Sequence, residues 1–289
     1  MTERPDQSVI TSPRSARVRS IAALAGRSAR RKQGLFRVEG PQSVRSLLAH
    51  RADLAQTLYL TEHAAGEHPE LPDLAARAGI PVQQVQDHIV RAMVREAEAG
   101  PGQGAVSPQG VIAIGRLPAE DPAQTAQAMA ALPAHGPATA VVLHEVRDPG
   151  NVGTLIRTAD AAGADLVILT RTSTDPFSPK AVRAATGSLF HLPVVTGADA
   201  PTLLRTVTEH AFVTAATSGY AETELFDIEL PERIAWILGN EAHGLDPATL
   251  ESAQLQVRIP LAGLAESLNV HTAATVCLYE TLRQRRRSR

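Results

Sequence analysis

The sequence predicts an α/β protein with a smaller domain followed by a larger one, on three observations. Short apolar segments alternate with helical segments along most of the 289 residues, an order typical of a mostly parallel sheet covered by helices. The apolar segments of the second half are continuous, as in strands that are buried on both faces. At roughly 150 residues per domain, the chain is long enough for two domains that each bury a core.

The first half has the segments of a small α/β domain. Strands are expected at residues 35–40, 56–60, 80–85 and 110–115, and helices near 41–50, 68–78 and 87–97. Residues 117–138 then combine four prolines with alanine and polar residues, and nothing in them requires burial. We therefore expect a first domain at 1–116 and a linker at 117–138.

The second half, residues 139–289, repeats the order of strand and helix. Strands are expected at 139–146, 165–170, 211–216, 234–239 and 255–260, and helices at 152–162, 178–188, 200–209, 246–252 and 268–285. Ligands of parallel sheets bind beyond the carboxyl ends of the strands. The loops that follow these strands are therefore the expected place for a site.

Composition excludes several classes of protein. Hydrophobic residues make up 44% and charged residues 20% of the chain, which is typical of a globular protein and not of a disordered one. No apolar segment approaches the ~18 residues of a membrane span, and the first residues carry no apolar signal segment, so a cytoplasmic location is expected by default. Cys277 is the only cysteine, which excludes an intramolecular disulfide and zinc sites built on paired cysteines. No metal is expected.

The two ends of the chain are basic and its middle is acidic. Residues 7–38 contain eight basic residues and no acidic residue, and residues 281–289 contain five arginines. Such ends suit contact with the phosphates of RNA, and the candidate RNA-binding residues are Arg30, Arg31, Lys32 and Arg37. The alternative is a solvated, partly flexible tail.

The first candidate loop follows the strand that ends near His144. Pro149 and Gly150 form a turn, and Asn151 is a possible cap for the helix that carries Arg157. Arg157 is a candidate ligand contact, and the alternative is a surface arginine paired with Glu145, Asp148 or Asp160.

The second candidate loop follows the strand at 234–239, which runs directly into Gly239. Glycine there lets a ligand approach the main chain, and Glu241 adds a carboxylate to the same loop. The alternative is that Gly239 and Asn240 form only a turn, with His243 as an ordinary loop histidine.

The third candidate loop follows Ile259 and leads into a long C-terminal helix. Ser267 and Asn269 at the start of this helix offer polar side chains beside free backbone N–H groups, and the alternative is plain helix capping. Cys277 falls on the apolar face of the helix, so we expect it to pack in the core and not to react.

Taken together, the three loops resemble the motifs of a known enzyme family. The segments are N-V-G-T-L-I-R-T-A at 151–159, L-G-N-E-A-H-G-L at 238–245 and I-P-L-A-G-L-A-E-S-L-N-V at 259–270. They resemble the motifs of the SpoU/TrmH family of SPOUT-class RNA 2'-O-ribose methyltransferases, and the resemblance covers about residues 139–285. The segment at 179–194 is similar to the family's sequence between its first two motifs. F-R-V-E-G-P-Q-S-V at 36–44 and G-I-P-V-Q-Q-V from residue 79 are similar to the substrate-binding domain often fused ahead of it.

The resemblance implies a parallel sheet with a deep C-terminal trefoil knot that holds S-adenosylmethionine, and a homodimer whose active site lies at the subunit interface. By matching positions, it implies a catalytic set of Asn151, Arg157, Glu241, Ser267 and Asn269. It also implies cofactor contacts, mostly through the main chain, at Ala216, Gly239, Ile259 and Leu268. Because main-chain groups carry these contacts, alanine substitutions there are expected to be mild.

The alternatives are a nicotinamide-dependent enzyme and a methyltransferase-like module that binds RNA without catalysis. The chain has no G-x-G-x-x-G turn directly after a strand, no G-x-x-x-x-G-K-[ST] loop and no G-x-S-x-G elbow. The complete polar set argues against a module without catalysis. A separate N-terminal domain favours 23S ribosomal RNA as substrate, while a tRNA ribose stays open because single-stranded RNA is recognised by shape and stacking.

Overall fold

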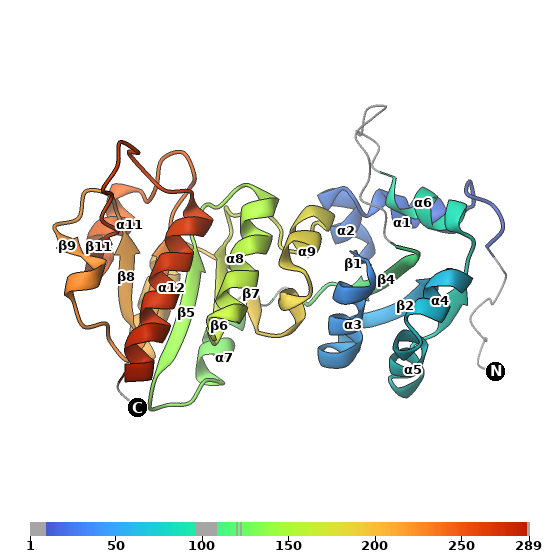
Figure 1. Cartoon of the computed structure of the whole chain (residues 1–289), viewed down its shortest axis with the longest axis horizontal. Coiled ribbons are helices and arrows are strands. Elements are labelled where there is room, and N and C mark those ends of the chain that lie inside the picture. The colour runs from blue at the N-terminus through green and yellow to red at the C-terminus, as the bar shows by residue number, and fades with distance from the viewer. Residues whose placement is uncertain (1–9, 96–108, 120, 122, 288–289) are drawn as a thin grey trace. The chain divides into compact units, whose positions relative to one another are not determined.

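The computed structural model describes residues 10–95, 109–119, 121 and 123–287. By their contacts, the described residues divide into two compact units (Figure 1). The first contains the residues up to Pro118 together with Phe177–His191, and the second contains 119–176 and the residues from Leu192 onward. The segment 177–191 therefore packs with the first unit, although the chain reaches it from a strand of the second. The expected domain boundaries at 116 and 139 do not include this insertion. That the domains end at these residues stays a prediction.

The first unit contains a mixed sheet with strand order β1-β4-β2-β3. The strands are β1 (Leu35–Glu39), β2 (Ala55–Leu60), β3 (Val82–Gln84) and β4 (Val111–Arg116). Strand β4 is antiparallel to β1 and β2, and β3 is parallel to β2. The helices are α1 (Ala16–Ala23), α2 (Arg27–Gln33), α3 (Pro41–His50), α4 (Glu62–Glu67), α5 (Glu70–Arg77), α6 (Asp87–Val94) and α9 (Pro179–Ala185). All four expected strands are present, and α3 has the expected bounds.

Helix α1 belongs to the core of the first unit. Its Val18 and Ile21 are buried against Ile89 and Met93 of α6. The segment from residue 10 to residue 38 is therefore folded, and the interpretation as a solvated tail is wrong for these residues. Residues 1–9 lie outside the described residues.

The second unit contains a seven-stranded sheet in the order β7-β6-β5-β10-β8-β11-β9, and every pairing in it is parallel. The strands are β5 (Ala138–Leu143), β6 (Leu166–Thr170), β7 (Val194–Ala198), β8 (Val213–Thr217), β9 (Thr223–Glu224), β10 (Arg233–Leu238) and β11 (Leu255–Arg258). The helices are α7 (Gln124–Ala130), α8 (Pro149–Ala161), α10 (Ala200–Glu209), α11 (Pro247–Ser252) and α12 (Val270–Arg287).

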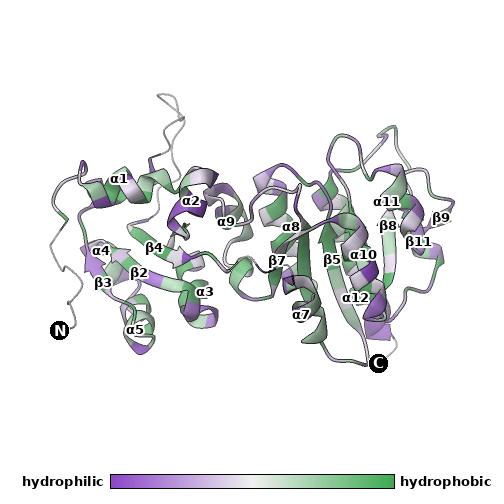
Figure 2. Ribbon diagram, turned by 180° about the vertical axis from the view of Figure 1, so that it is seen from behind, coloured by the Kyte–Doolittle hydropathy of each residue, from purple (hydrophilic) through white to green (hydrophobic). Residues whose placement is uncertain are grey.

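Helices cover both faces of this sheet, as expected. Helices α8 and α12 pack on each other over one face (Figure 1), and α7 and α10 pack on the other (Figure 2). The strands between them are apolar along their length (Figure 2), because both of their faces are buried. None of the helices in the described part of the chain has the length and apolar character needed to cross a membrane.

Three elements of the second unit were not predicted: the strand β7, the two-residue strand β9 and the helix α7. Strand β7 was not predicted, because Val194–Ala198 is short and contains a glycine. Helix α7 lies within 117–138, where a linker is expected, and its Met129 is 2% exposed in the core beneath the sheet.

Cys277 is fully buried, and burial raises the pKa of its thiol to about 12. The predicted packing role of Cys277 is confirmed.

Candidate functional site

The strand order brings the three candidate loops to one edge of the parallel sheet. Strands β5, β10, β8 and β11 are consecutive neighbours, so the loops that follow them start side by side. The order of the chain reverses between β5 and β10, because β6 and β7 lie on one side of β5 and the later strands on the other. A reversal of this kind is where open α/β sheets bind ligands.

Glu241 connects the second candidate loop to the first. Its Oε1 accepts hydrogen bonds from Asn151 Nδ2 at 3.1 Å and from the backbone N–H of Asp148 at 3.1 Å. Its Oε2 accepts from the backbone N–H of Arg147 at 3.2 Å. One carboxylate therefore fixes both the Asn151 side chain and the backbone that leads into α8.

Asn151 is free to make this contact because it does not cap α8. The helix begins at Pro149, and Asp148 caps it by accepting from the backbone N–H of Asn151 at 2.9 Å. The expected capping by Asn151 is wrong, because proline in the first helical position sets the helix start at residue 149, three residues earlier than expected.

The Glu241 carboxylate is held in its charged form. Burial raises its pKa, but the hydrogen bonds from Asn151 and from the main chain outweigh burial, and the net pKa lies below the ordinary 4.5. A carboxyl whose pKa falls on folding stabilises the folded state above its unfolded pKa. This stabilisation is lost as the pH falls through the lowered pKa.

Replacing Glu241 by glutamine therefore has a pH signature. We expect E241Q to melt at a lower temperature than the wild type at pH 7, because the amide cannot accept all three hydrogen bonds as a carboxylate does. The difference narrows towards pH 4 and below, where the wild-type carboxyl takes up a proton. Thermal unfolding at several pH values measures this, and E251Q, at an exposed position of α11, is the control. A difference that is the same at pH 7 and pH 4 contradicts the assignment.

Asn240 is a second connection that the sequence argument missed. Its Nδ2 donates to the backbone oxygen of Glu145 at 2.9 Å, and its Oδ1 accepts from the backbone N–H of Ala242 at 2.8 Å. Its main chain exchanges two hydrogen bonds of 2.9 Å with Gly244. The sequence argument proposed a ligand approach at Gly239, with a plain turn as the alternative, and gave the Asn240 side chain no role. The chemistry of asparagine could have predicted this role. Its side-chain oxygen can accept hydrogen bonds within its own turn, while its NH₂ group donates to a different loop.

The start of α12 lies beside α8. His271 Nε2 and Thr158 Oγ1 are 2.9 Å apart, and Asn269 Oδ1 accepts from the backbone N–H of His271 at 2.8 Å. Arg157 precedes Thr158 and lies on the exposed side of α8. The structure thus places Arg157 on α8 and Asn269 directly before α12, and these two helices pack against each other. For Asn269 the capping alternative is present, and a ligand contact by either residue stays a prediction.

The expected cofactor residues lie at the same edge with different exposure. Ala216 is buried and pairs with Ile237 of β10 and Gln256 of β11. Gly239 is buried, and a Cβ on it would lie 2.6 Å from the Gly244 oxygen and the Leu245 nitrogen. The remaining positions lie in 259–269, which is neither helix nor strand: Ile259 and Leu268 are partly exposed, and Ser267 is exposed.

Two of the four expected RNA-binding residues are buried in the first unit. Arg30 is 2% exposed and donates to the backbone oxygens of Leu24 at 2.9 Å and Ala25 at 2.7 Å. Arg37 is fully buried, forms an ion pair with Glu39 at 2.7 Å and donates to the Met93 oxygen at 2.6 Å. Their assignment to RNA is wrong, because a buried guanidinium cannot meet a phosphate. Arg31 and Lys32 are exposed on α2.

Comparison with known proteins identifies both parts of the chain. Residues 138–279 match the SpoU rRNA Methylase family, and residues 15–102 match the MRM3-like substrate binding domain. The chain is 31% identical over 278 residues to the 23S rRNA (uridine(2479)-2'-O)-methyltransferase of Streptomyces viridochromogenes, covering 94% of this chain and 91% of that protein. It is 31% identical over 252 residues to the 23S rRNA (guanosine-2'-O-)-methyltransferase RlmB of Pseudomonas putida, covering 87% and 97%.

Solved structures give the same result. An AdoMet-bound rRNA methyltransferase from Sinorhizobium meliloti matches with a TM-score of 0.78 and 29% identity over 95% of this chain and 97% of that chain. The SpoU methyltransferase AviRb of Streptomyces viridochromogenes, in complex with AdoMet, matches with a TM-score of 0.75 and 30% identity over 94% and 98%.

The fold and the converging loops define an α/β protein of the SPOUT methyltransferase class, in which a smaller domain precedes the methyltransferase domain. Within that class, the chain belongs to the SpoU rRNA methylase family. The resemblance seen in the three motifs is confirmed.

Proposed function

We propose that this protein transfers a methyl group from S-adenosylmethionine to a ribose 2'-hydroxyl of 23S ribosomal RNA. The relatives named above carry this activity in their names, and the chain spans nearly their whole length. The observation that carries the proposal is the contact of Glu241 with Asn151 and the loop before α8. It joins the first two motifs at the sheet edge where a ligand is expected.

The residues at this edge suit the cofactor. Adenine needs main-chain N–H and C=O groups at close range, and Gly239 has a buried main chain that packs directly against the main chain of Gly244 and Leu245. We assign the cofactor to the main chain around Gly239, Ile259 and Leu268, with Ala216 at the end of β8. When bound, S-adenosylmethionine supplies an activated methyl group on its sulfonium.

The side chains around the edge then position the hydroxyl and stabilise its charge. A guanidinium offers hydrogen-bond donors only, so we assign Arg157 to the negative charge that develops on the 2'-oxygen and to a nearby phosphate. The hydroxyl proton leaves to a phosphate oxygen or to water. Asn151, Ser267 and Asn269 hold the ribose, and Glu241 holds Asn151 and its loop.

Three further features belong to the proposal: a trefoil knot formed by the C-terminal segment, a homodimer and a cytoplasmic location. The family resemblance supports the first two, and the ribosomal RNA substrates in the names of the relatives support the third. Sedimentation equilibrium tests the homodimer, since a dimer doubles the 30.6 kDa mass of the chain.

Mapping of ribose methylation tests the substrate. In cells that lack this protein, we expect one 2'-O-methyl group to disappear from 23S RNA, and purified protein with S-adenosylmethionine to restore it on RNA from those cells. Loss of a tRNA methyl group instead, or no change in any RNA, contradicts the proposed substrate.

Arg31 and Lys32 are the remaining candidates for RNA contact in the first unit. We expect the double variant R31A/K32A to bind RNA more weakly and to reduce the slope of log K against log salt by about 0.7–0.9 per lost phosphate contact. R31K/K32R keeps both charges and serves as the control. Deletion of residues 1–32 is a poor test, because it removes the core residues Val18 and Ile21. An unchanged slope would show that these two side chains are exposed on the surface without contacting RNA phosphates.

A further inference from the structure

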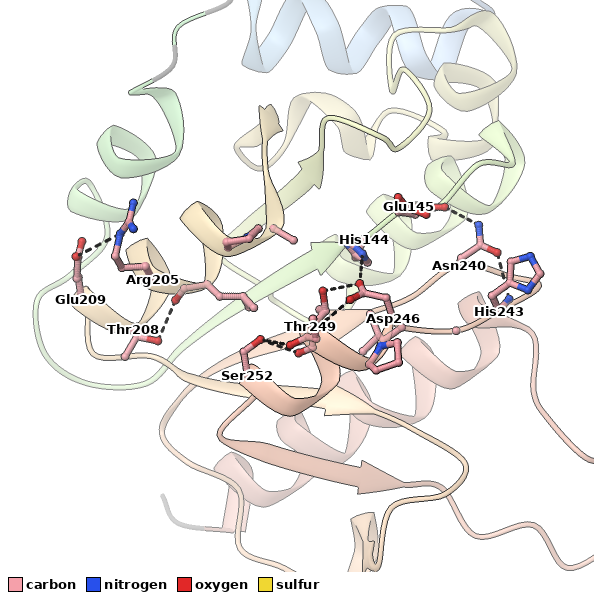
Figure 3. A pocket seen from close by; sticks show the side chains of 17 residues that line it. His144, Glu145, Arg205, Thr208, Glu209, Asn240, His243, Asp246, Thr249 and Ser252 are labelled. Carbon is pink, nitrogen blue, oxygen red and sulfur yellow. Dashed lines mark hydrogen bonds and ion pairs between the residues drawn. The ribbon is translucent and has the colours of Figure 1, made fainter.

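His144 is a buried histidine between the first two candidate loops, and the proposed mechanism does not use it. It directly follows β5 and is 8% exposed. Its Nε2 lies 3.0 Å from Asp246 Oδ2 (Figure 3). His144 thus begins the loop that leads to Asn151, and Asp246 ends the loop that contains Gly239 and Glu241.

Asp246 is a fixed acceptor. It caps α11, accepting at Oδ1 from the backbone N–H of Thr249 at 3.0 Å and at Oδ2 from the Thr249 hydroxyl at 2.6 Å. The hydrogen bonds from Thr249, and then the one from His144, lower the pKa of the Asp246 carboxyl. A charged acceptor held by its own helix gives His144 a defined position to donate to.

The loop that begins at His144 has a backbone conformation that requires stabilising contacts. Glu145 has a φ of +56°, a conformation that residues other than glycine rarely adopt and that costs free energy unless the surroundings fix it. Its N–H donates to Thr170 Oγ1 at 3.1 Å, and its oxygen accepts from Asn240. The His144–Asp246 pair is the neighbouring contact, one residue earlier in the chain.

Packing does not replace this contact on the side of α10 and α11. His144, Asp246 and Thr249 line a groove of about 1010 Å³ together with residues of both helices (Figure 3). The groove is open space on that side. Two hydrogen bonds join the loops along it: the contact between His144 Nε2 and Asp246 Oδ2, and the bond from Asn240 Nδ2 to the Glu145 oxygen.

We propose that His144 is a positioning residue for methyl transfer, which holds the β5–α8 loop against the β10–α11 loop through Asp246. The inference rests on the proposed function for its effect on turnover. Its structural part, the coupling of the two loops, stands on the contacts alone.

The experiment compares H144L and H144Q with the wild type. Leucine fills the buried space but cannot donate, whereas the glutamine amide reaches approximately the position of the imidazole Nε2. We expect H144L to lower kcat about tenfold, the size of one hydrogen bond to a charged group. The KM for S-adenosylmethionine stays within a few-fold, and H144Q restores most of kcat. R205L, at an exposed arginine of the same groove on α10, is the matched control.

Hydrogen exchange gives a readout that does not depend on activity. The backbone N–H groups of Arg147 and Asp148 donate to Glu241, so we expect them to exchange faster in H144L than in the wild type and R205L. If the wild type shows no methyl transfer, the proposed function fails, and exchange still decides the coupling. If the wild type is active and H144L matches it in kcat and in exchange, the proposal for His144 is overturned. A loss of kcat that H144Q does not restore also overturns it.

Discussion

Replacing Arg157 by alanine is expected to lower the rate of methyl transfer by about 10²–10³, the usual effect of removing one donor aimed at a developing negative charge. Arg157 lies on the exposed side of α8, on the helix whose start Glu241 holds through Asn151. The main chain around Gly239 is assigned to the cofactor, so the affinity for S-adenosylmethionine stays within a few-fold. Single-turnover methylation and calorimetry measure the two quantities separately.

Arg157→Lys distinguishes a planar guanidinium from a positive charge. We expect it to remain impaired, because an ammonium group cannot contact two oxygens in parallel as a guanidinium does. R205A, at an exposed arginine of α10, is the control for the loss of a surface charge and keeps wild-type turnover. Near-normal turnover of R157A assigns Arg157 to the protein surface.

The fold was predictable from sequence where periodicity and burial agree. Strands β5 and β6 are buried along their whole length, and β10 is buried from Ile234 to Leu238, so their apolar segments stand out in the sequence. Helices α1 and α2 were missed, because they are short and lie in a segment whose charge suggested a tail. Helix α1 is stabilised by packing against α6, which lies far along the chain and which local patterns do not report.

The candidate site was predictable as a set of loops but not as a set of contacts. The sequence places Glu241 after a strand, but only the fold shows that it reaches Asn151, 90 residues away. Arg30 and Arg37 looked like their exposed neighbours, because their partners lie elsewhere in the fold or in the main chain. Arg37 is held by the Met93 oxygen, 56 residues away. Charge alone cannot separate a buried arginine from an exposed one, since tertiary contacts decide which guanidinium is satisfied inside.

Gly239→Ala is the other substitution with a large expected effect, and here the structure differs from the sequence argument. Main-chain binding of the cofactor predicted a mild effect. The Cβ of an alanine would instead lie 2.6 Å from the Gly244 oxygen and from the Leu245 nitrogen. Both atoms belong to the main chain, so a side-chain rotation cannot relieve the clash, and the turn closed by Asn240 and Gly244 must move.

We expect G239A to lower the free energy of unfolding by about 1–3 kcal/mol, the usual cost of an added methyl group in a packed site. S-adenosylmethionine binding weakens about tenfold or more, because each 1.4 kcal/mol of lost contact is a factor of about ten. Gly263 in the third candidate loop is the matched control, because a Cβ there meets no atom within 4 Å, so G263A remains close to the wild type. Chemical denaturation and calorimetry measure both quantities. If G239A binds S-adenosylmethionine with wild-type affinity, the turn at 239–244 can move without disturbing the cofactor. That result would contradict the role of this turn in cofactor binding.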